Sequence, residues 1–595
     1  MSALEIPREY KKLRSEKMFK KVLLLCALFS ITAFGYTPGT YDGEAKGYGG
    51  QIKVQVELSE NRIEEVKVVE HKETPIVSDV ALERISKEIV EFQSLAVDSV
   101  AGATVTSAGL RFAVRTALEE AGVTISDLMR RAEVAPVVKT DAEYTADVII
   151  IGGGGAGLAA ATSARQNGAS VILIEKLSRL GGNTVIAGGA FNAAGTPMQS
   201  ERSIEDSIEL HYTHTFEGGD QVANPELVRT YTENAPLALE WLQSLGVEFT
   251  DVFTVLGALH PRSHRPALPL GTGFIVAHRE FAEKNGVQIF YETEAKDLVT
   301  KDGRVVGVTA EGKTENITFN ANKGVVIATG GFGADVAYRI QHNPNLTANI
   351  LTTNHPGANA SGIIMAEKLG ANTVGMEYIQ LLPMGDPRTG SLSGNIEHSV
   401  EDRIFVNKEG NRFVAEDARR DVMTNALFAQ TDAYLWVIVD SQVYPNTDVK
   451  NNFNETIGEL MADNRAFSGD TIEELAEKIN VPAENLKKTI EDYNNAVDAK
   501  EDEFGRVLFG MKIEQAPFYA GARIPTVHHT MGGLEINTSA QVLDKDGNVI
   551  PGLYAAGEVT GGIHGSNRLG GNALSDIAVF GRIAGENAAK EEVQD

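Results

Sequence analysis

The residues with the clearest chemical meaning are glycines at one predicted turn between a strand and a helix. The segment "ADVIIIGGGGAGLAAATSARQNGASVILIEK" places Gly152, Gly154 and Gly157 between an apolar run and a helical pattern, and Glu175 follows eighteen residues after Gly157. Glycines at this spacing let backbone amides approach a pyrophosphate, and the acid binds a ribose hydroxyl. A tight turn without a ligand is the alternative, but strand, helix, second strand and acid all stand in register. The segment predicts a dinucleotide site.

Three later glycine-rich stretches extend this predicted site. They are "GGNTVIAGGAFNAAGT" from Gly181, "VVIATGGFG" from Val325, and "LYAAGEVTGGIHGSNRLGGNALSDIAVFGRIAG" near the C-terminus. Their separation predicts an α/β sheet that is interrupted by an insert and then resumes. The last stretch predicts a strand that brings Gly557 and Glu558 to the cofactor, followed by a helix from about Asn572; an ordinary strand and helix of the sheet is the alternative.

A different kind of run, "DSVAGATVTSAG", begins at Asp98 and combines small residues with hydroxyls. It is either a turn that opens the helix "SAGLRFAVRTAL", with Thr106 or Ser107 as its cap, or an exposed acceptor for a chemical group. The preceding strands "QIKVQVEL" and "IEEVKVVE" alternate with period two, and "VALERISKEIVEF" has helical spacing. These elements predict a small α+β domain over residues 39–134, followed by the polar linker "RRAEVAPVVKTDAEYTA".

The N-terminal segment resembles an export signal. Lys20 and Lys21 precede an apolar run over 22–34, and small residues precede a cleavage point after Gly35. This pattern predicts a signal peptide over residues 1–35 and export to the periplasm or cell surface; an uncleaved anchor is the alternative. The only cysteine of the chain, Cys26, lies in this segment, so the mature chain forms no disulfide and no cysteine-ligated metal site; we expect no metal. A formal net charge of −27 argues against nucleic acid as a partner.

Four motifs together resemble the fumarate reductase and succinate dehydrogenase flavoprotein family. The glycine fingerprint, "HHTMGG", "GEVTGG" and "NRLGGNA" are similar to its soluble flavocytochrome fumarate reductases and urocanate reductases, over about 146–585. The resemblance implies a Rossmann-type FAD-binding domain in two parts, 141–378 and 521–595, with an inserted α+β capping domain, 379–520. Non-covalent FAD is expected at Gly152, Gly154, Ala156, Gly157, Glu175, Lys176, Gly182, Asn183, Thr184, Gly188, Gly189, Ala328, Thr329, Gly330, His529, Gly557, Glu558, Ala573 and Leu574.

The run "DSVAGAT" resembles the flavinylation motif of FMN-binding domains in sodium-pumping quinone reductases and urocanate reductases. In those domains the last Thr carries FMN through a phosphoester. The resemblance implies covalent FMN at Thr104 and maturation by a flavin transferase.

Reduction of a carbon–carbon double bond beside a carboxylate needs an anchor for the carboxylate, a hydride and a proton. By resemblance His528 and Arg568 form the anchor, and an Arg of "FVAEDARRDVMT" donates the proton: Arg420, or in the less favoured register Arg419. Glu397 and Arg403 are candidates for the relay that reprotonates this Arg. For Glu397 a solvated surface acid is the alternative.

The substrate pocket departs from the fumarate reductase pattern. Leu382 and Ile396 stand where those enzymes have His and Thr, and Phe191 stands where they tend to have Met. An apolar wall does not replace hydrogen bonds to a second carboxylate. We therefore expect an enoate with a flat or aromatic tail, such as urocanate, bound by His528, Arg568, Leu382, Phe191 and Gly571; Glu397 is also a candidate to face an imidazole.

The expected function is an exported reductase of anaerobic respiration, with electrons passing from FMN to FAD to substrate. No second dinucleotide fingerprint follows the first, so the expected donor is a quinol-linked membrane protein or a cytochrome rather than a nicotinamide. A fumarate reductase and a non-catalytic flavin electron carrier are the alternatives.

Overall fold

The computed structural model describes residues 36–73, 77–100, 103–130, 138–255, 257 and 260–592. The chain folds into two compact units, a small N-terminal one and a larger one that holds most of the chain. The predicted signal peptide lies outside the described residues.

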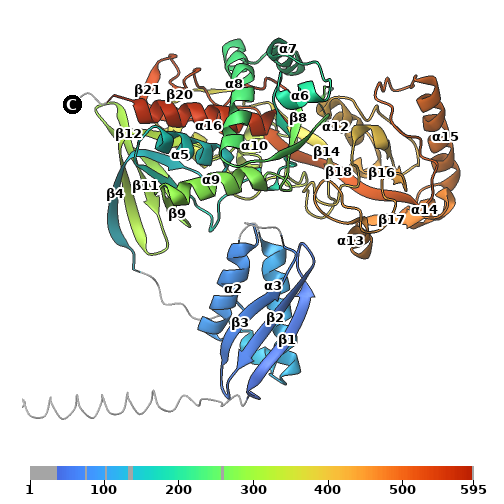
Figure 1. Ribbon diagram of the computed structural model, residues 1–595, viewed down its shortest axis with the longest axis horizontal. Coiled ribbons are helices and arrows are strands. Elements are labelled where there is room, and N and C mark those ends of the chain that lie inside the picture. Colours follow the sequence, from blue (N-terminus) through green and yellow to red (C-terminus); the bar gives the residue numbers. More distant parts are fainter. Residues whose placement is uncertain are drawn as a thin grey trace, which may run out of the picture. The chain divides into compact units, whose positions relative to one another are not determined.

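The small unit is a three-stranded antiparallel sheet of β1 (Gly39–Lys46), β2 (Gln51–Leu58) and β3 (Ile63–Glu70), with α2 (Asp79–Phe92), α3 (Thr104–Glu120) and α4 (Ile125–Leu128) (Figure 1). The strands alternate because one face packs on the helices: every second residue of β2, from Ile52 to Leu58, is buried. The predicted cap at Thr106 or Ser107 is wrong, because α3 begins at Thr104 and both residues lie inside it.

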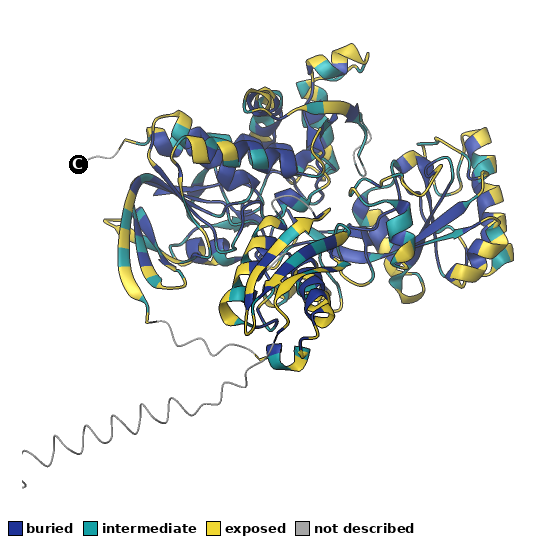
Figure 2. Cartoon of the chain, turned by 60° about the horizontal axis from the view of Figure 1, so that its bottom comes forward, coloured by how far each residue is buried: buried dark blue, intermediate teal, exposed yellow. Residues whose placement is uncertain are grey.

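The larger unit is built around an eight-stranded mixed sheet in the order β10-β11-β12-β4-β5-β9, with β21 beside β12 and β20 beside β21. Its parallel core is β4 (Thr140–Ile151), β5 (Val171–Ile174), β9 (Gln288–Phe290), β12 (Glu315–Ile327) and β21 (Val549–Ala555). The other strands are β10 (Glu294–Lys301), β11 (Arg304–Glu311) and β20 (Gln541–Leu543). The buried residues of this sheet gather in β4, β5, β12 and β21, whereas the outer strand β10 has none (Figure 2).

The N-terminal part of β4 corrects the predicted linker. Residues 140–146 were expected to be polar linker, but they pair in parallel with β12 from Glu315 to Ala321. Half-exposed edge pairing accepts polar residues, so composition alone did not separate this strand end from a linker.

Helices cover the sheet, and α16 (Asn572–Lys590) lies along α5 (Gly155–Gln166) (Figure 1). Their backbones approach closely because Gly581 and Gly585 face α5, where a Cβ would lie 2.6 Å from Ala156 O and 2.2 Å from Ala160 O. The remaining elements of this domain are α6 (Pro197–Glu201), α7 (Ile208–Gly218), α8 (Pro225–Ser244), α9 (Thr272–Lys284), α10 (Val336–His342), α11 (Ser361–Glu367), η1 (Thr184–Ile186), the small sheet β6 (Phe191–Asn192), β7 (Phe249–Phe253) and β8 (Ser263–Pro266), and the pair β13 (Thr373–Val374) and β19 (Gly533–Leu534).

The inserted domain has its own five-stranded sheet, in the order β14-β18-β16-β15 with β17 beside β18. The strands are β14 (Ile379–Gly385), β15 (Ile404–Val406), β16 (Leu435–Asp440), β17 (Ala466–Gly469) and β18 (Phe518–Thr530); the helices are α12 (Arg420–Phe428), α13 (Ile457–Ala462), α14 (Ile472–Ile479), α15 (Ala483–Ala499), η2 (Val400–Asp402) and η3 (Thr431–Ala433). The predicted α/β class, with an inserted α+β domain and a small α+β unit ahead of it, is confirmed.

Among the described residues, no helix is long and apolar enough to cross a membrane. No group of three or more potential metal ligands gathers among them.

Candidate active site and cofactor cavity

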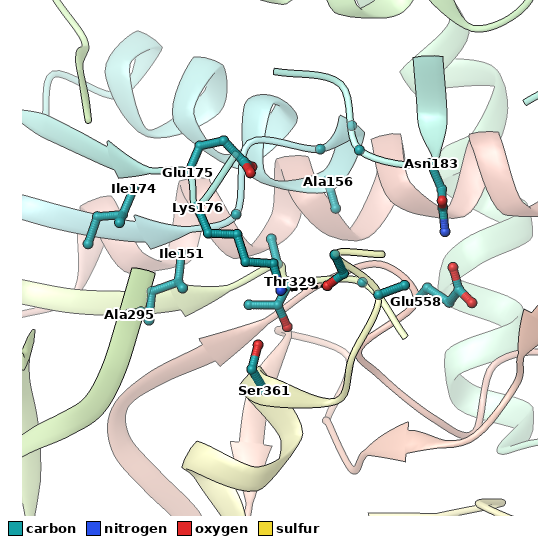
Figure 3. A pocket seen from close by; sticks show the side chains of 18 of the residues that line it. Ile151, Ala156, Ile174, Glu175, Lys176, Asn183, Ala295, Thr329, Ser361 and Glu558 are labelled. Atoms are coloured by element: carbon teal, nitrogen blue, oxygen red, sulfur yellow. Dashed lines mark hydrogen bonds between the residues drawn. The ribbon is translucent and has the colours of Figure 1, made fainter. Parts of the chain in front are cut away.

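A cavity opens at the carboxyl ends of β4, β5 and β12 (Figure 3). This is the edge at which parallel α/β sheets bind dinucleotides. Of the expected FAD residues, the cavity is lined by Gly152, Gly154, Ala156, Glu175, Lys176, Gly182, Asn183, Thr184, Ala328, Thr329, Gly330 and Glu558.

The glycine turn has the geometry that the spacing predicted. A Cβ on Gly157 would lie 1.8 Å from Gly152 O, and one on Gly152, which has a φ of +108°, would lie 2.4 Å from Ala328 O. These two positions therefore need glycine for close packing of helix and strands. A Cβ on Gly154 would meet nothing within 4 Å, because it would project into the cavity.

Glu175 and Lys176 end β5 at the cavity wall. Glu175 accepts hydrogen bonds from Gly153 N and Leu177 N, both at 2.7 Å, and burial raises its pKa. Lys176 Nζ donates to Gly357 O at 2.6 Å and to Asn359 Oδ1 at 2.8 Å. These contacts hold both side chains in place without closing the cavity.

The residues present fit FAD. The backbone amides at the start of α5 face the cavity as an anion site. Thr329 Oγ1, in the cavity wall, is buried and has no hydrogen-bond partner among the described residues. On the opposite wall, Glu558 accepts from Thr530 N at 3.0 Å and its pKa is raised by burial.

Seven of the expected FAD residues do not line this cavity: Gly157, Gly188, Gly189, His529, Gly557, Ala573 and Leu574. The sequence interpretation also missed thirteen residues that do line it: Ile151, Gly155, Ile174, Thr293, Glu294, Ala295, His355, Gly357, Ala358, Ser361, Met365, Ala556 and Ile577. Four of these belong to the small-residue run "HPGANAS" from His355, and this run was the available sequence signal.

Two buried arginines converge at the junction of the Rossmann-type and inserted domains. Arg420 Nη1, from the first turn of α12, and Arg568 Nη2, from the segment before α16, each donate to Gln380 Oε1 at 3.0 Å. Gln380 Nε2 donates in turn to Arg568 O at 2.8 Å and Asn567 Oδ1 at 3.1 Å. Gln380, which the sequence interpretation did not select, therefore fixes the spacing of the two guanidinium groups.

His528 reaches the same site through a break in sheet register. Gln380 pairs with His529 and Leu381 with Val527, so His528 is the extra residue on β18. Such a bulge turns a side chain out of the regular alternation. Thr353 Oγ1 lies 2.9 Å from His528 Nδ1 and orients the ring, leaving Nε2 for a ligand.

Burial and mutual repulsion shift the titration of this group. Burial, with Arg568 nearby, holds the pKa of Arg420 well below its usual range, whereas Glu397 opposes the shift. Burial lowers the pKa of Arg568 to about 10, and burial with both arginines lowers that of His528. The site is an anion site in which a guanidinium can release a proton more readily than in water.

Glu397 lies against Arg403, with which it forms a buried ion pair. The alternative of a solvated surface acid at Glu397 is wrong, because the side chain is enclosed by the inserted domain. Arg419, by contrast, pairs with Asp220 and Asp421 and its side chain is 36% exposed. The structure thus brings Arg420 to the site and leaves Arg419 at the surface.

The apolar candidates Leu382, Ile396 and Phe191 are all buried. Leu382 is two residues beyond Gln380 on the same strand, hence on the same face, and packs in one core cluster with Ile396. Phe191 is fully buried with its ring beside Phe249 and Phe274. Gly571 has a φ of +84° and lies against Asn192, whose Nδ2 donates to Gly570 O at 2.8 Å. Their contact with substrate stays a prediction.

In the small unit, Thr104 is exposed at the start of α3, while the hydroxyl of Thr106 is buried and donates to Glu73. Residues 101–102 of the "DSVAGAT" run lie outside the described residues. The structure therefore presents Thr104, and not Thr106, to solvent.

A dinucleotide cavity and a buried arginine pair in one unit of the chain indicate a flavin-dependent oxidoreductase. A family model described as FAD binding domain matches residues 147–574, and one described as FMN-binding domain matches residues 47–119. The chain belongs to the FAD-binding flavoprotein family of fumarate, urocanate and acrylate reductases, with an FMN-binding domain ahead of the FAD-binding one. The predicted family and flavins are confirmed.

The relatives have different named substrates. The chain is 37% identical to a urocanate reductase of Eggerthella lenta, over 94% of this chain and 93% of that protein. It is 39% identical to an NADH:acrylate oxidoreductase of Vibrio harveyi over 93% of its length, but spans only 61% of that relative. A flavocytochrome c3 fumarate reductase in an open conformation superposes with a TM-score of 0.63 at 36% identity, covering 76% of this chain and 79% of that one.

Proposed function

We propose that this protein reduces the carbon–carbon double bond of an α,β-unsaturated carboxylate whose far end carries no second carboxylate. The observation that supports it best is the convergence of Arg420 and Arg568 on Gln380 Oε1. A substrate carboxylate is a stronger acceptor for the Arg568 guanidinium than a neutral amide, and Gln380 holds Arg420 close to the carboxylate so bound. Urocanate and acrylate, named in two relatives, meet this description.

The residues divide the chemistry as follows. His528 and Arg568 bind the conjugated carboxylate and stabilise the charge that grows on it in the transition state. FAD bound in the cavity supplies the hydride. Arg420 delivers a proton to the α-carbon, and Glu397, held by Arg403, returns a proton to Arg420.

The distal wall favours an uncharged tail. Leu382 and Ile396 are buried in the inserted domain and offer no hydrogen bond from their side chains. Because Glu397 is paired with Arg403, its carboxylate serves the relay rather than an imidazole ring.

The test is kcat/KM for acrylate, urocanate, cinnamate and fumarate with one reduced viologen under anaerobic conditions. A missing hydrogen bond to a charged group costs on the order of 2 kcal/mol, roughly thirty-fold in a rate constant. We therefore expect kcat/KM for fumarate to be lower than that for the best monocarboxylate by this factor. Fumarate winning by tenfold would assign a fumarate reductase, and no turnover of any enoate would assign a flavin electron carrier.

We further propose that electrons enter at FMN, carried at Thr104 after a flavin transferase has acted, and pass to FAD. The expected donor is a quinol-linked membrane protein or a cytochrome. Two relatives are named for NADH, so NADH belongs in the comparison: stopped-flow reduction of the flavins by NADH faster than by menaquinol analogues would replace the quinol-linked donor.

Export is proposed from Lys20, Lys21 and the apolar run that follows them. Cell fractionation with N-terminal sequencing tests it: a mature terminus near Tyr36 outside the cytoplasm is expected. Intact protein in the cytoplasm of its host would refute it.

A further inference from the structure

A second buried carboxyl, Asp402, lies beside the Glu397–Arg403 pair. Ser399 and Asp402 cap one turn reciprocally, and Asp402 Oδ2 accepts the Ser399 N–H at 2.9 Å. The N–H of His398 also bonds to this carboxyl group. The turn therefore folds Asp402 back against the residue that follows Glu397.

One oxygen of the Asp402 carboxyl group makes no structural hydrogen bond among the described residues. Asp402 is only 7% exposed, and its Oδ1 has no hydrogen-bond partner among the described residues. A buried carboxylate in such a position is costly, whereas a carboxylic acid is tolerated. The group is thus suited to hold a proton.

The charged and titratable groups around Asp402 come from four segments. Glu397 and Arg403 are on its own loop, Tyr444 follows β16, and Tyr493 is on α15. Arg506 binds the backbone carbonyls of Val400 and Arg403. Burial and the charge of Glu397 raise the pKa of Asp402 to about 7, against Arg403 and the two amides.

We propose that Asp402 is the proton donor that recharges Glu397 during turnover, an inference that rests on the proposed reductase function. After Arg420 has protonated the substrate carbon, the O–H bond of Asp402 breaks and an O–H bond forms on the Glu397 carboxylate. The proton then moves from Glu397 to the neutral guanidine of Arg420, which leaves Glu397 as the carboxylate paired with Arg403. Asp402 takes a proton from solvent, so one proton enters for each that leaves and no electron moves.

The kinetic test uses Asp402→Asn, which is isosteric and keeps an acceptor for Ser399 N–H. In the wild type, kcat should fall as pH rises through the pKa of Asp402, because the donor must be protonated. In Asp402→Asn, kcat should drop about tenfold, lose this pH dependence and leave KM within twofold. Glu401→Gln, an exposed neighbour, is the control and should keep the wild-type profile. A wild-type rate and pH profile in Asp402→Asn would overturn the proposal.

A second measurement needs no turnover. Infrared difference spectra of the resting FAD-bound protein, titrated from acid to alkaline pH, should show a protonated carboxyl that disappears near neutrality and is missing in Asp402→Asn. Persistence of this signal in the variant would also overturn the proposal. Failure to reduce any enoate, by contrast, would refute the reductase function, and the two failures are therefore separate results.

Discussion

Gln380 Oε1 accepts from two guanidinium groups at once, one expected to anchor the substrate and the other to protonate it. Two cations in one buried site repel each other, and a shared neutral acceptor sets their separation at little cost. A single neutral residue can therefore hold two buried cations at a fixed separation, ready to bind an anion.

Replacing Gln380 by Ala should therefore remove one hydrogen bond from each arginine and leave the two guanidinium groups less well positioned. Hydrogen bonds to charged groups contribute roughly 1.5–3 kcal/mol, and we expect kcat/KM to fall by about thirty-fold or more with FAD still bound. Gln341→Ala, an exposed glutamine on α10, is the matched control. A Gln380→Ala enzyme with wild-type kcat/KM would show that Arg568 and Arg420 are held by other contacts.

Arg419 and Arg420 are adjacent, yet they have opposite surroundings. Arg420→Ala should abolish turnover while leaving FAD binding and substrate affinity largely intact, because it removes the proton donor. Arg419→Ala should change kcat less than threefold, since its partners Asp220 and Asp421 are at the surface. Steady-state kinetics and substrate-induced flavin absorbance changes measure both; the reverse order of effects would move the proton donor to Arg419.

At the scale of helices and strands, the positions of the site residues depend on a strand bulge and on the close packing of two helices. The bulge on β18 turns His528 toward Arg568. The glycines of α16 let this helix pack closely on α5, which fixes the start of α16 just after the Arg568 segment. The cavity and the arginine site are thereby built by the same few elements.

The Gly157→Ala variant tests whether FAD binding depends on this close backbone packing. In Gly157→Ala the new Cβ would meet Gly152 O at 1.8 Å, so the turn must open and FAD should be lost. The ratio of FAD to protein after purification is the measurement, and less than a fifth of the wild-type content is expected. Gly273→Ala is the control, since its Cβ would have only ordinary contacts at 3.7 Å; equal FAD content in both variants would contradict the argument.

At the scale of the whole molecule, the proposed electron route joins two separately folded flavin domains. Co-expression with a flavin transferase should add the mass of one FMN moiety to the intact protein, and Thr104→Ala should remove it. Thr116→Ala, an exposed threonine on the same helix, should still gain it. FMN-free Thr104→Ala protein should keep reductase activity with a small viologen donor that reaches FAD directly; retention of the FMN mass would place the attachment elsewhere.

Local sequence patterns were sufficient to predict several of the elements that build the cofactor site. The turn between β4 and α5, the late strand β21 and the helix after Gly571 are encoded by neighbouring residues, because glycine spacing and apolar periodicity act over a single strand or turn. The resemblance of four motifs to a known family then predicted the family, FAD and FMN.

The tertiary structure decided what depends on residues far apart in sequence. Gln380 bonds Arg568 across 188 positions, and nothing in "MEYIQLLP" marks that glutamine as a bridge. Glu397 is a buried ion-pair partner rather than a surface acid only because Arg403 folds against it, and the Asp402 carboxyl group is enclosed only through the turn that starts at Ser399. Burial and charge proximity set these properties, and both arise from packing rather than from local sequence.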